Sequence, residues 1–445
     1  MFADDIVIIA DTKKDLEAML NATFDYSLRW RFKFNIDKCA VVIFDNKATI
    51  LSWNYGVCEE KCSCGRHYRF GTQWIKEVQN YKYLGMELDK KLSFKDFKAR
   101  MLDKARRNML RIWYLGIRGG YPSVKASLNL YETLVRTLLE YGSEIWGDEV
   151  WPAGEALQME MGRRILRCSS KTTKAAIQGD LGFWSLRARR DLSRKIYWGN
   201  LMNANDSKLC KQVYQESKRL YSVNKRSNWS STIKKILTKY NMSELWRDER
   251  KLLDLDGKGN RDAKTVLDHR RFWRGFIHNK IGNYEEQRWK AVMDKKPKLR
   301  TYVLFKTKLK LENYLSISNI KGRKLMASLR SGTNMLEIET GRWKRVAKEQ
   351  RLCEQCELKQ PEDEKHFVVE CSRYQDVRGK FFDQVSTISN GKWNLRLMTN
   401  ENLFILLMAG TRDKFETKIL QAFQCFIVKC FRLRKDSSLS SECGK

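Results

Sequence analysis

The chain has 445 residues, 42% of them hydrophobic, and carries 86 lysines and arginines against 53 aspartates and glutamates, a formal net charge of +33. This length is enough for two to four domains with cores of their own, and the apolar share excludes an unfolded chain. A positive excess of this size is usually neutralised by polyanions, so nucleic acid is the first expected partner and an anionic membrane surface the second.

The sequence carries no signal for a membrane or for secretion. No apolar run reaches the about 18 residues that span a bilayer, and the amino end lacks the basic and apolar regions of a signal peptide. We therefore expect an intracellular protein, nuclear or cytoplasmic, that is neither secreted nor inserted in a membrane. Its 12 cysteines are then expected to be reduced thiols, either packed or bound to metal.

Two adjacent carboxylates, Asp4 and Asp5, precede the apolar run 6–9. The run predicts a short strand buried on both faces, with the carboxylates in a turn at its mouth. Carboxylate oxygens suit Mg²⁺, and metals held in this way serve phosphoryl transfer to a 3′ hydroxyl. The alternative is ordinary turn chemistry before a core strand.

The segment Phe2-Ala3-Asp4-Asp5, followed by Ile-Val-Ile-Ile-Ala, resembles the aromatic-Ala-Asp-Asp hairpin of reverse transcriptases, especially those of non-LTR (LINE-type) retrotransposons. The resemblance implies that Asp4 and Asp5 are two of the three metal-binding aspartates of the palm. The third aspartate and the fingers lie upstream of this motif in the family. We therefore expect a carboxyl-terminal fragment that is inactive alone, whether Met1 is a true start or a truncation.

A helix is expected from about 12 to 30, followed by a turn and a second buried strand over 39–44. Asn35 and Lys38 resemble a turn of the family whose lysine lies near the incoming nucleotide. The alternative for Lys38 is a solvated turn lysine.

The segment Tyr81–Leu88 resembles the primer-grip hairpin of the family, which contacts the 3′ end of the primer. The resemblance assigns this contact to Tyr83, Leu84 and Gly85, where a glycine lets the backbone approach closely. An ordinary hairpin with a glycine turn is the alternative.

The insertion that precedes this hairpin contains Cys58, Cys62, Cys64 and His67. Zinc is possible there, but free loop thiols are the preferred interpretation, because adjacent ligands rarely close a tetrahedron.

From residue 94 the chain becomes helical and basic. Ser123 is expected to cap a second helix, and such basic antiparallel helices suit a thumb that grips a duplex through phosphates. An ordinary bundle with a solvated basic face is the alternative. Further helices are expected over about 152–167, 172–180 and 184–204, with Gly182 as a C-cap. Four later tryptophans are expected to anchor helix packing more often than to stack on bases: Trp229, Trp246, Trp273 and Trp289.

Residues 298–330 combine many basic groups with interleaved aromatic residues and a single acid, Glu312. This composition makes the segment the best local candidate for a nucleic-acid surface. The expected contacts are Lys298, Arg300, Lys306, Lys308, Lys310, Lys321, Arg323 and Lys324.

A second constellation, Cys353-x2-Cys356-x9-His366-x4-Cys371, has the number and kind of ligands for a closed tetrahedral zinc site. With all four positions filled by protein, such a zinc is structural. Free thiols are the alternative. The spacing resembles the Cys-Cys-His-Cys module near the carboxyl end of LINE-type proteins.

Taken together, the sequence predicts an α+β chain in which a truncated reverse-transcriptase palm precedes a mostly α-helical thumb and linker region and a small zinc module. The expected partners are RNA and DNA, and the parent activity is RNA-directed DNA polymerisation with Mg²⁺. The alternative function is a basic RNA- or DNA-binding protein without catalysis. The predicted segments are a palm remnant (1–92), a helical thumb-like region (93–150), a basic helical linker (151–345), the zinc module (346–380) and a helical tail (381–445).

Overall fold

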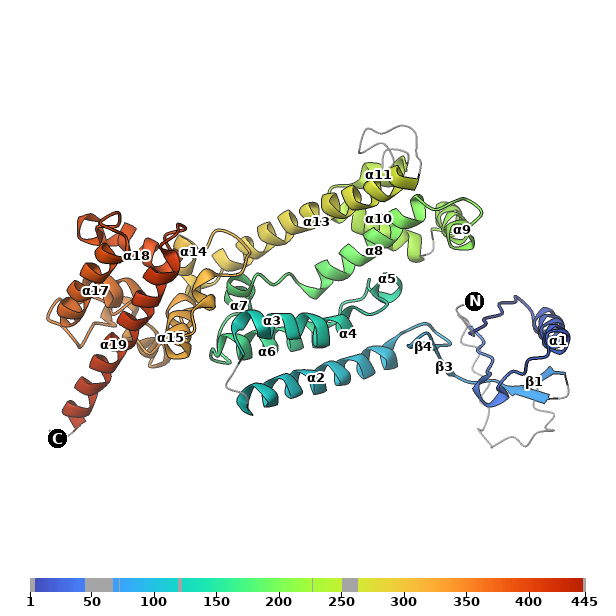
Figure 1. Ribbon diagram of the computed structural model, residues 1–445, viewed down its shortest axis with the longest axis horizontal. Coiled ribbons are helices and arrows are strands. Elements are labelled where there is room, and N and C mark those ends of the chain that lie inside the picture. The colour runs from blue at the N-terminus through green and yellow to red at the C-terminus, as the bar shows by residue number, and fades with distance from the viewer. Residues whose placement is uncertain are drawn as a thin grey trace. The chain divides into compact units, whose positions relative to one another are not determined.

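The computed structural model describes residues 5–44, 67–71, 73–118, 122–225, 227–249 and 263–442. Contacts divide the chain into two compact units, 1–103 and 104–445. The described part is mostly helical, with two antiparallel two-stranded sheets in the first unit (Figure 1). Asp4 and the cysteines of the insertion, Cys58, Cys62 and Cys64, lie outside the described residues.

The first unit contains one helix, two hairpins and the start of a long helix. Helix α1 begins after Thr12, whose hydroxyl accepts a hydrogen bond from the Asp15 N–H at 3.1 Å, so the helix predicted over 12–30 is confirmed. The elements are α1 (Lys13–Arg29), a 3₁₀ turn η1 (Ile36–Lys38), β1 (His67–Phe70), β2 (Gln73–Lys76), β3 (Asn80–Tyr83), β4 (Met86–Asp89) and α2 (Lys95–Arg118), which runs on into the second unit.

The core of the first unit lies between α1 and the β1–β2 hairpin. Leu20 of the helix packs with the buried Tyr68, Phe70 and Ile75 of the strands. Gly71 makes the turn of this hairpin at φ 58°, and a Cβ there would lie 2.3 Å from the Phe24 ring. The position therefore requires glycine both for its backbone conformation and for the space beside α1.

Both strands predicted beside the Asp pair are wrong in this structure. The backbone over 6–10 is irregular, and Ile9 is 81% exposed. Of the segment 39–44, Val41 alone pairs, through an isolated bridge to Glu77. An apolar run becomes a strand only where a neighbouring strand takes up its backbone hydrogen bonds, and no described segment does so for 6–9.

The second unit is helical throughout its described part. Helix α13 packs along α8, and α19 packs on α15 and α17. The longer helices are α3 (Val124–Tyr131), α6 (Pro152–Leu166), α7 (Lys174–Leu181), α8 (Leu186–Met202), α9 (Leu209–Asn224), α10 (Trp229–Lys239), α13 (Ala263–Asp294), α15 (Ile320–Arg330), α17 (Gln375–Ile388), α18 (Asn400–Ala409) and α19 (Glu416–Glu442). The shorter ones are a π-helical turn η2 (Glu132–Arg136), α4 (Thr137–Glu140), α5 (Ser143–Trp146), α11 (Ser243–Arg247), η3 (Pro297–Leu299), α14 (Tyr302–Phe305), η4 (Asn313–Ser316), α16 (Glu337–Trp343), η5 (Lys348–Gln350), a second π-helical turn η6 (His366–Glu370), η7 (Ser372–Tyr374) and η8 (Leu395–Leu397).

The predicted caps are present. The Ser123 hydroxyl accepts from the Ala126 N–H at 3.1 Å, and Gly182 ends α7 in the left-handed region at φ 68°. A glycine there carries no Cβ penalty, which is why it is the preferred residue after a helix.

Tryptophans hold the second unit together. Trp273 and Trp289 of α13 are each 1% exposed, and their indole N–H groups donate to the carbonyls of Lys195 and Ala175 at 3.1 and 2.8 Å. Gly199 of α8 lies so close to Trp273 that a Cβ would meet its indole nitrogen at 2.1 Å. Trp273 and Trp289 therefore anchor helix packing, as predicted from the sequence.

Lys195 of α8 is buried within this bundle, with its ammonium 3.6 Å from the centre of the Tyr240 ring. Asp191, the nearby acid, already accepts from the Lys239 ammonium and from the Tyr240 hydroxyl. Burial lowers the pKa of Lys195 to about 6, with Asp191 opposing that shift and Lys239 adding to it. In the unfolded chain a lysine titrates near its ordinary value of about 10.4.

This difference predicts a pH-dependent stability. Between the two pKa values the unfolded chain binds one proton more, so the free energy of unfolding rises with pH. From pH 7 to 9 the parent chain should gain roughly 2 kcal/mol over the Lys195→Met variant. Urea unfolding at both pH values measures this, with the exposed Lys235→Met of α10 as the control that keeps the parent slope. Equal slopes for the parent chain and Lys195→Met would contradict the prediction.

Candidate functional sites: a hairpin turn and a metal centre

The β3–β4 hairpin turns through two residues, Leu84 at φ 45° and Gly85 at φ 79°. Tyr83 and Met86 are the pair that closes it. Two positive φ angles in a two-residue loop match the twist of the strands, and glycine is favoured in such a loop. Arg100 of α2 fixes the turn, because its guanidinium donates to the Gly85 carbonyl at 3.0 Å and lies 3.3 Å from the Glu87 carboxylate.

The structure brings this hairpin together with two other predicted site segments. The Tyr81 hydroxyl of β3 donates to the Lys38 carbonyl at 2.7 Å, so the hairpin is joined to the turn η1. The pKa of Tyr81 is raised, first by burial and then by the nearby Cys39 and Asp5. Asp5, the Lys38 turn and the hairpin therefore lie in one region of the first unit, with Asp5 and Lys38 both exposed.

The second site is a cluster of three cysteines and one histidine. The sulfurs of Cys353, Cys356 and Cys371 and a ring nitrogen of His366 all lie within 4.8 Å of one another. The two thiols Cys353 and Cys371 are 3.9 Å apart, and the Cys356 sulfur is 3.4 Å from His366 Nε2. A tetrahedral zinc with its ordinary bond lengths places two sulfurs about 3.8 Å apart and a sulfur and a nitrogen about 3.6 Å apart. The donor set therefore fits zinc in both kind and spacing.

Local backbone structure holds the ligands in place. The segment around Cys353 forms a short antiparallel hairpin, in which the Cys353 N–H donates to the Gln360 carbonyl at 2.8 Å. His366 opens the π-helical turn η6, and the Cys371 N–H closes that turn on the His366 carbonyl at 2.8 Å. This turn carries the last two ligands to the same point, as the prediction of a following helix requires.

Hydrogen bonds and nearby charges couple the side chains of the cluster. The shared hydrogen bond with Cys371, followed by burial, raises the pKa of Cys353 to about 12, and the same hydrogen bond lowers the pKa of Cys371. The His366 Nδ1 atom lies 3.8 Å from the Glu370 carboxylate. A carboxylate behind a metal-bound histidine fixes the ring's tautomer and orientation.

Buried ion pairs connect the cluster to the rest of the second unit. Glu362 of the hairpin pairs with Arg434 of α19 through two contacts of 2.8 and 2.7 Å. Glu364, just before the histidine, pairs with Arg300 through two contacts of 2.9 Å. The module is thus built into the helical unit rather than attached to it as a free finger.

The first residues of the chain, which include the hairpin, match a known protein family. Residues 1–88 match the family model described as reverse transcriptase (RNA-dependent DNA polymerase). Over these residues the chain is similar to reverse transcriptases. It is 28% identical over 152 residues to the RNA-directed DNA polymerase from mobile element jockey of Drosophila melanogaster, a match that covers 33% of this chain and 15% of that protein. No solved structure matches the chain significantly.

The matched segment ends at β4, so the helical unit and the Cys₃His cluster lie outside the matched reverse transcriptase segment. Among the described helices, none is long and apolar enough to cross a membrane.

The basic segment predicted to bind nucleic acid divides into two groups. Arg300 is paired with Glu339 and Glu364, and Lys306 is 2% exposed, pairs with Glu312 and donates to the Lys310 carbonyl. These two cations are neutralised inside the chain, so we leave them out of the proposed surface. The others are exposed or half-buried: Lys298, Lys308, Lys310, Lys321, Arg323 and Lys324.

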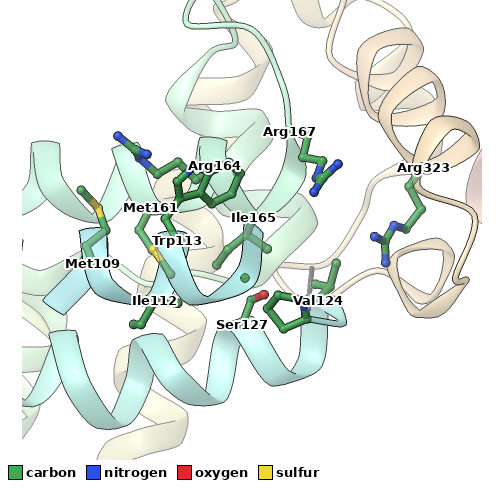
Figure 2. A pocket seen from close by; sticks show the side chains of 12 residues that line it. Met109, Ile112, Trp113, Val124, Ser127, Met161, Arg164, Ile165, Arg167 and Arg323 are labelled. Atoms are coloured by element: carbon green, nitrogen blue, oxygen red, sulfur yellow. The ribbon is translucent and has the colours of Figure 1, made fainter. Parts of the chain in front are cut away.

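Two further arginines that sequence reasoning missed lie near Arg323. Arg164 and Arg167, at the end of α6, line a hollow together with Arg323 of α15 (Figure 2). The signal in the sequence is the basic cluster Arg163-Arg164-x-x-Arg167, which reads as an ordinary helix end until α15 is placed beside it.

Proposed function

We propose that this chain works in RNA-directed DNA synthesis, as a part of the reverse transcriptase of a non-LTR mobile element. The observation that carries the proposal is that Tyr81 of the β3–β4 hairpin meets both the Lys38 turn and the neighbourhood of Asp5 within the matched segment. These are the segments that the family resemblance assigns to metal, nucleotide and primer.

Each residue has a role in this proposal. Asp4 and Asp5 bind Mg²⁺, which supplies activation of the primer hydroxyl and stabilisation of charge in phosphoryl transfer. Lys38 lies beside the incoming nucleotide. Tyr83, Leu84 and Gly85 hold the primer end, where the absent Cβ of Gly85 lets the backbone approach the strand closely.

Binding of RNA and DNA is assigned to the exposed basic side chains. In the second unit these include Lys308, Lys310, Lys321 and Lys324, together with Arg323. Such groups neutralise phosphates and release counterions on binding. Zinc at the Cys₃His cluster is structural in this proposal, because all four positions of the tetrahedron are filled by protein.

These 445 residues by themselves are proposed to bind template and primer without extending the primer. The reason is that the metal site of the family needs a third carboxylate, which precedes the motif at Asp4 and Asp5. Removal of one ligand and of the fingers forfeits most of the positioning on which phosphoryl transfer depends.

Primer extension on a homopolymer RNA template with Mg²⁺ tests this. We expect extension at background, unchanged in Asp5→Ala, together with binding of the template-primer that weakens steeply with salt. Asp11→Ala, an exposed carboxylate close by in the chain, is the control. Robust extension that Asp5→Ala abolishes and Asp11→Ala leaves intact would overturn the inactivity while supporting the metal role.

A second candidate function, nucleic-acid binding without any part in catalysis, is favoured by the net charge of +33. Binding measurements with different primer ends distinguish the two candidate functions. A primer-holding hairpin predicts tighter binding of a recessed 3′ end than of a blunt duplex, whereas a general basic surface predicts equal binding of both.

A further inference from the structure

The hollow beside α6 has an apolar interior and a basic rim. It lies among α2, α3, α6 and α15. Buried side chains form its wall, among them Met109, Ile112, Val124 and Met161. All of these residues belong to the second unit.

The arginines at this hollow differ in how their charge is met. Arg164 is neutralised within the chain, because its guanidinium lies 2.8 Å from the Glu160 carboxylate and over the Trp113 ring. Arg323, in contrast, forms no ion pair among the residues that the structure describes, and its guanidinium donates to the Leu315 carbonyl at 3.3 Å. Arg167 and Arg323 point into the same opening from α6 and α15 (Figure 2).

Two guanidinium groups that share a partly desolvated opening repel each other. Burial lowers the pKa of Arg323, and the charge of Arg167 lowers it further. An anion between the two groups would offset this repulsion. Arginine forks match the oxygens of a phosphate in pairs, and the apolar wall strengthens that contact by lowering the local dielectric.

The backbone at Arg167 adds a second observation. Arg167 is the C-cap of α6 and lies in the left-handed region at φ 53° and ψ 35°. Glycine is the usual residue in this conformation, as Gly182 is at the end of α7. Glycine would therefore fit this backbone position without strain.

We infer that Arg167 and Arg323 together hold one phosphate of a nucleic-acid strand. The inference rests on the proposed nucleic-acid binding and gives it a defined anchor in the second unit.

The sharpest variant is Arg167→Gly, because glycine suits the left-handed backbone and the fold should not suffer. Its matched control is Arg345→Gly, which removes one exposed arginine with φ 60° at a position that does not line the hollow. The readout is the affinity for a short single-stranded RNA as a function of salt.

We expect Arg167→Gly to weaken binding about tenfold and to reduce the slope of log K against log salt by about 0.7, the value for one single-strand phosphate. Arg323→Gln should have a similar effect. The double variant should be little worse than either single one, because both arginines act on one phosphate. Arg345→Gly should stay near the parent chain, and thermal melting should place Arg167→Gly no lower than the parent.

Two arms distinguish the source of the phosphate. If Arg167→Gly lowers the affinity equally for strands with and without a 5′-terminal phosphate, the site holds an internal phosphodiester. If it lowers the affinity for the phosphorylated strand alone, the site holds a terminal phosphate monoester. Equal behaviour of Arg167→Gly and Arg345→Gly would overturn the inference and leave nucleic-acid binding intact. Absence of RNA and DNA binding by the parent chain would overturn the proposed function itself.

Discussion

Replacing Arg330 by methionine should lower the free energy of unfolding of the second unit by about 3–5 kcal/mol. Arg330 is fully buried at the end of α15, and its guanidinium contacts two acids, Asp180 at 2.9 Å and Glu312 at 2.8 Å. Tyr302 and Tyr314 donate their hydroxyls to the same Asp180 carboxylate at 2.8 and 2.6 Å. The loss of the arginine leaves two carboxylates in the interior with Lys306 as their remaining cation.

The effect is expected to be large because a buried charge without its partner pays the full cost of desolvation. Burial alone would raise the pKa of Asp180, but Arg330 and Lys306 hold that pKa below its ordinary value. A carboxyl with a depressed pKa stabilises the fold at neutral pH, and that contribution is lost on acidification below about pH 4. Near pH 7 the full loss should therefore be seen.

Chemical denaturation followed by tryptophan fluorescence measures this effect. Arg396→Met, which breaks the exposed pair with Asp383, is the control and should cost less than about 1 kcal/mol. Adding Asp180→Asn to Arg330→Met should recover part of the loss, because it removes one unpaired charge. A loss with Arg330→Met no larger than that of the control would contradict the role of the network.

Cys371→Ser should abolish stoichiometric zinc binding. The parent chain is expected to hold one zinc per molecule, because four ligand atoms of the right kind lie within 4.8 Å of one another. The Cys371 side chain is fully buried in that cluster, so its loss leaves three ligands and an open position. A chelator should act in the same way, since metal binding and folding are coupled in such modules.

The loss of zinc should also destabilise the packing of α19. The hairpin that carries Cys353 also carries Glu362, whose pair with Arg434 joins it to that helix. Metal analysis and thermal melting, each with and without chelator, measure the two effects. Cys430→Ala is the control, because this buried cysteine of α19 is not among the four ligands and should leave one zinc in place. A parent chain that purifies without zinc and melts identically with chelator would refute the metal centre.

A milder change tests the residue behind the ligand. Glu370→Gln removes the charge near His366 Nδ1 and should weaken zinc binding by about 10–100-fold without abolishing it.

Local patterns in the sequence predicted most of the helices and both candidate sites. Thr12, Ser123 and Gly182 mark helix ends by side-chain and backbone chemistry that acts within a few residues, so their roles are visible without a fold. The same holds for the two-residue turn at Leu84 and Gly85. The spacing of the Cys₃His cluster likewise predicts that two of its residues lie on one turn and the other two on the helix that follows.

Long-range pairing was beyond such patterns. The run at 6–9 has the composition of a strand, but whether it becomes one depends on a neighbour elsewhere in the chain. Arg300 and Lys306 belong to a basic run that looks like a solvated face, yet one of the two acids that pair with Arg300 lies 64 residues further on. One of the two acids that pair with Arg330 lies 150 residues earlier.

The sequence by itself thus determined most of the helices, the caps, the hairpin turn and the four members of the Cys₃His cluster, because each depends on residues close together in the chain. Only the tertiary structure decided which cations are buried and which remain for a nucleic acid, since burial depends on the acids and apolar walls that distant segments bring to each position. Arg167 and Arg323 illustrate the difference: they lie far apart in the sequence, and only the packing of α15 beside α6 directs both into one opening.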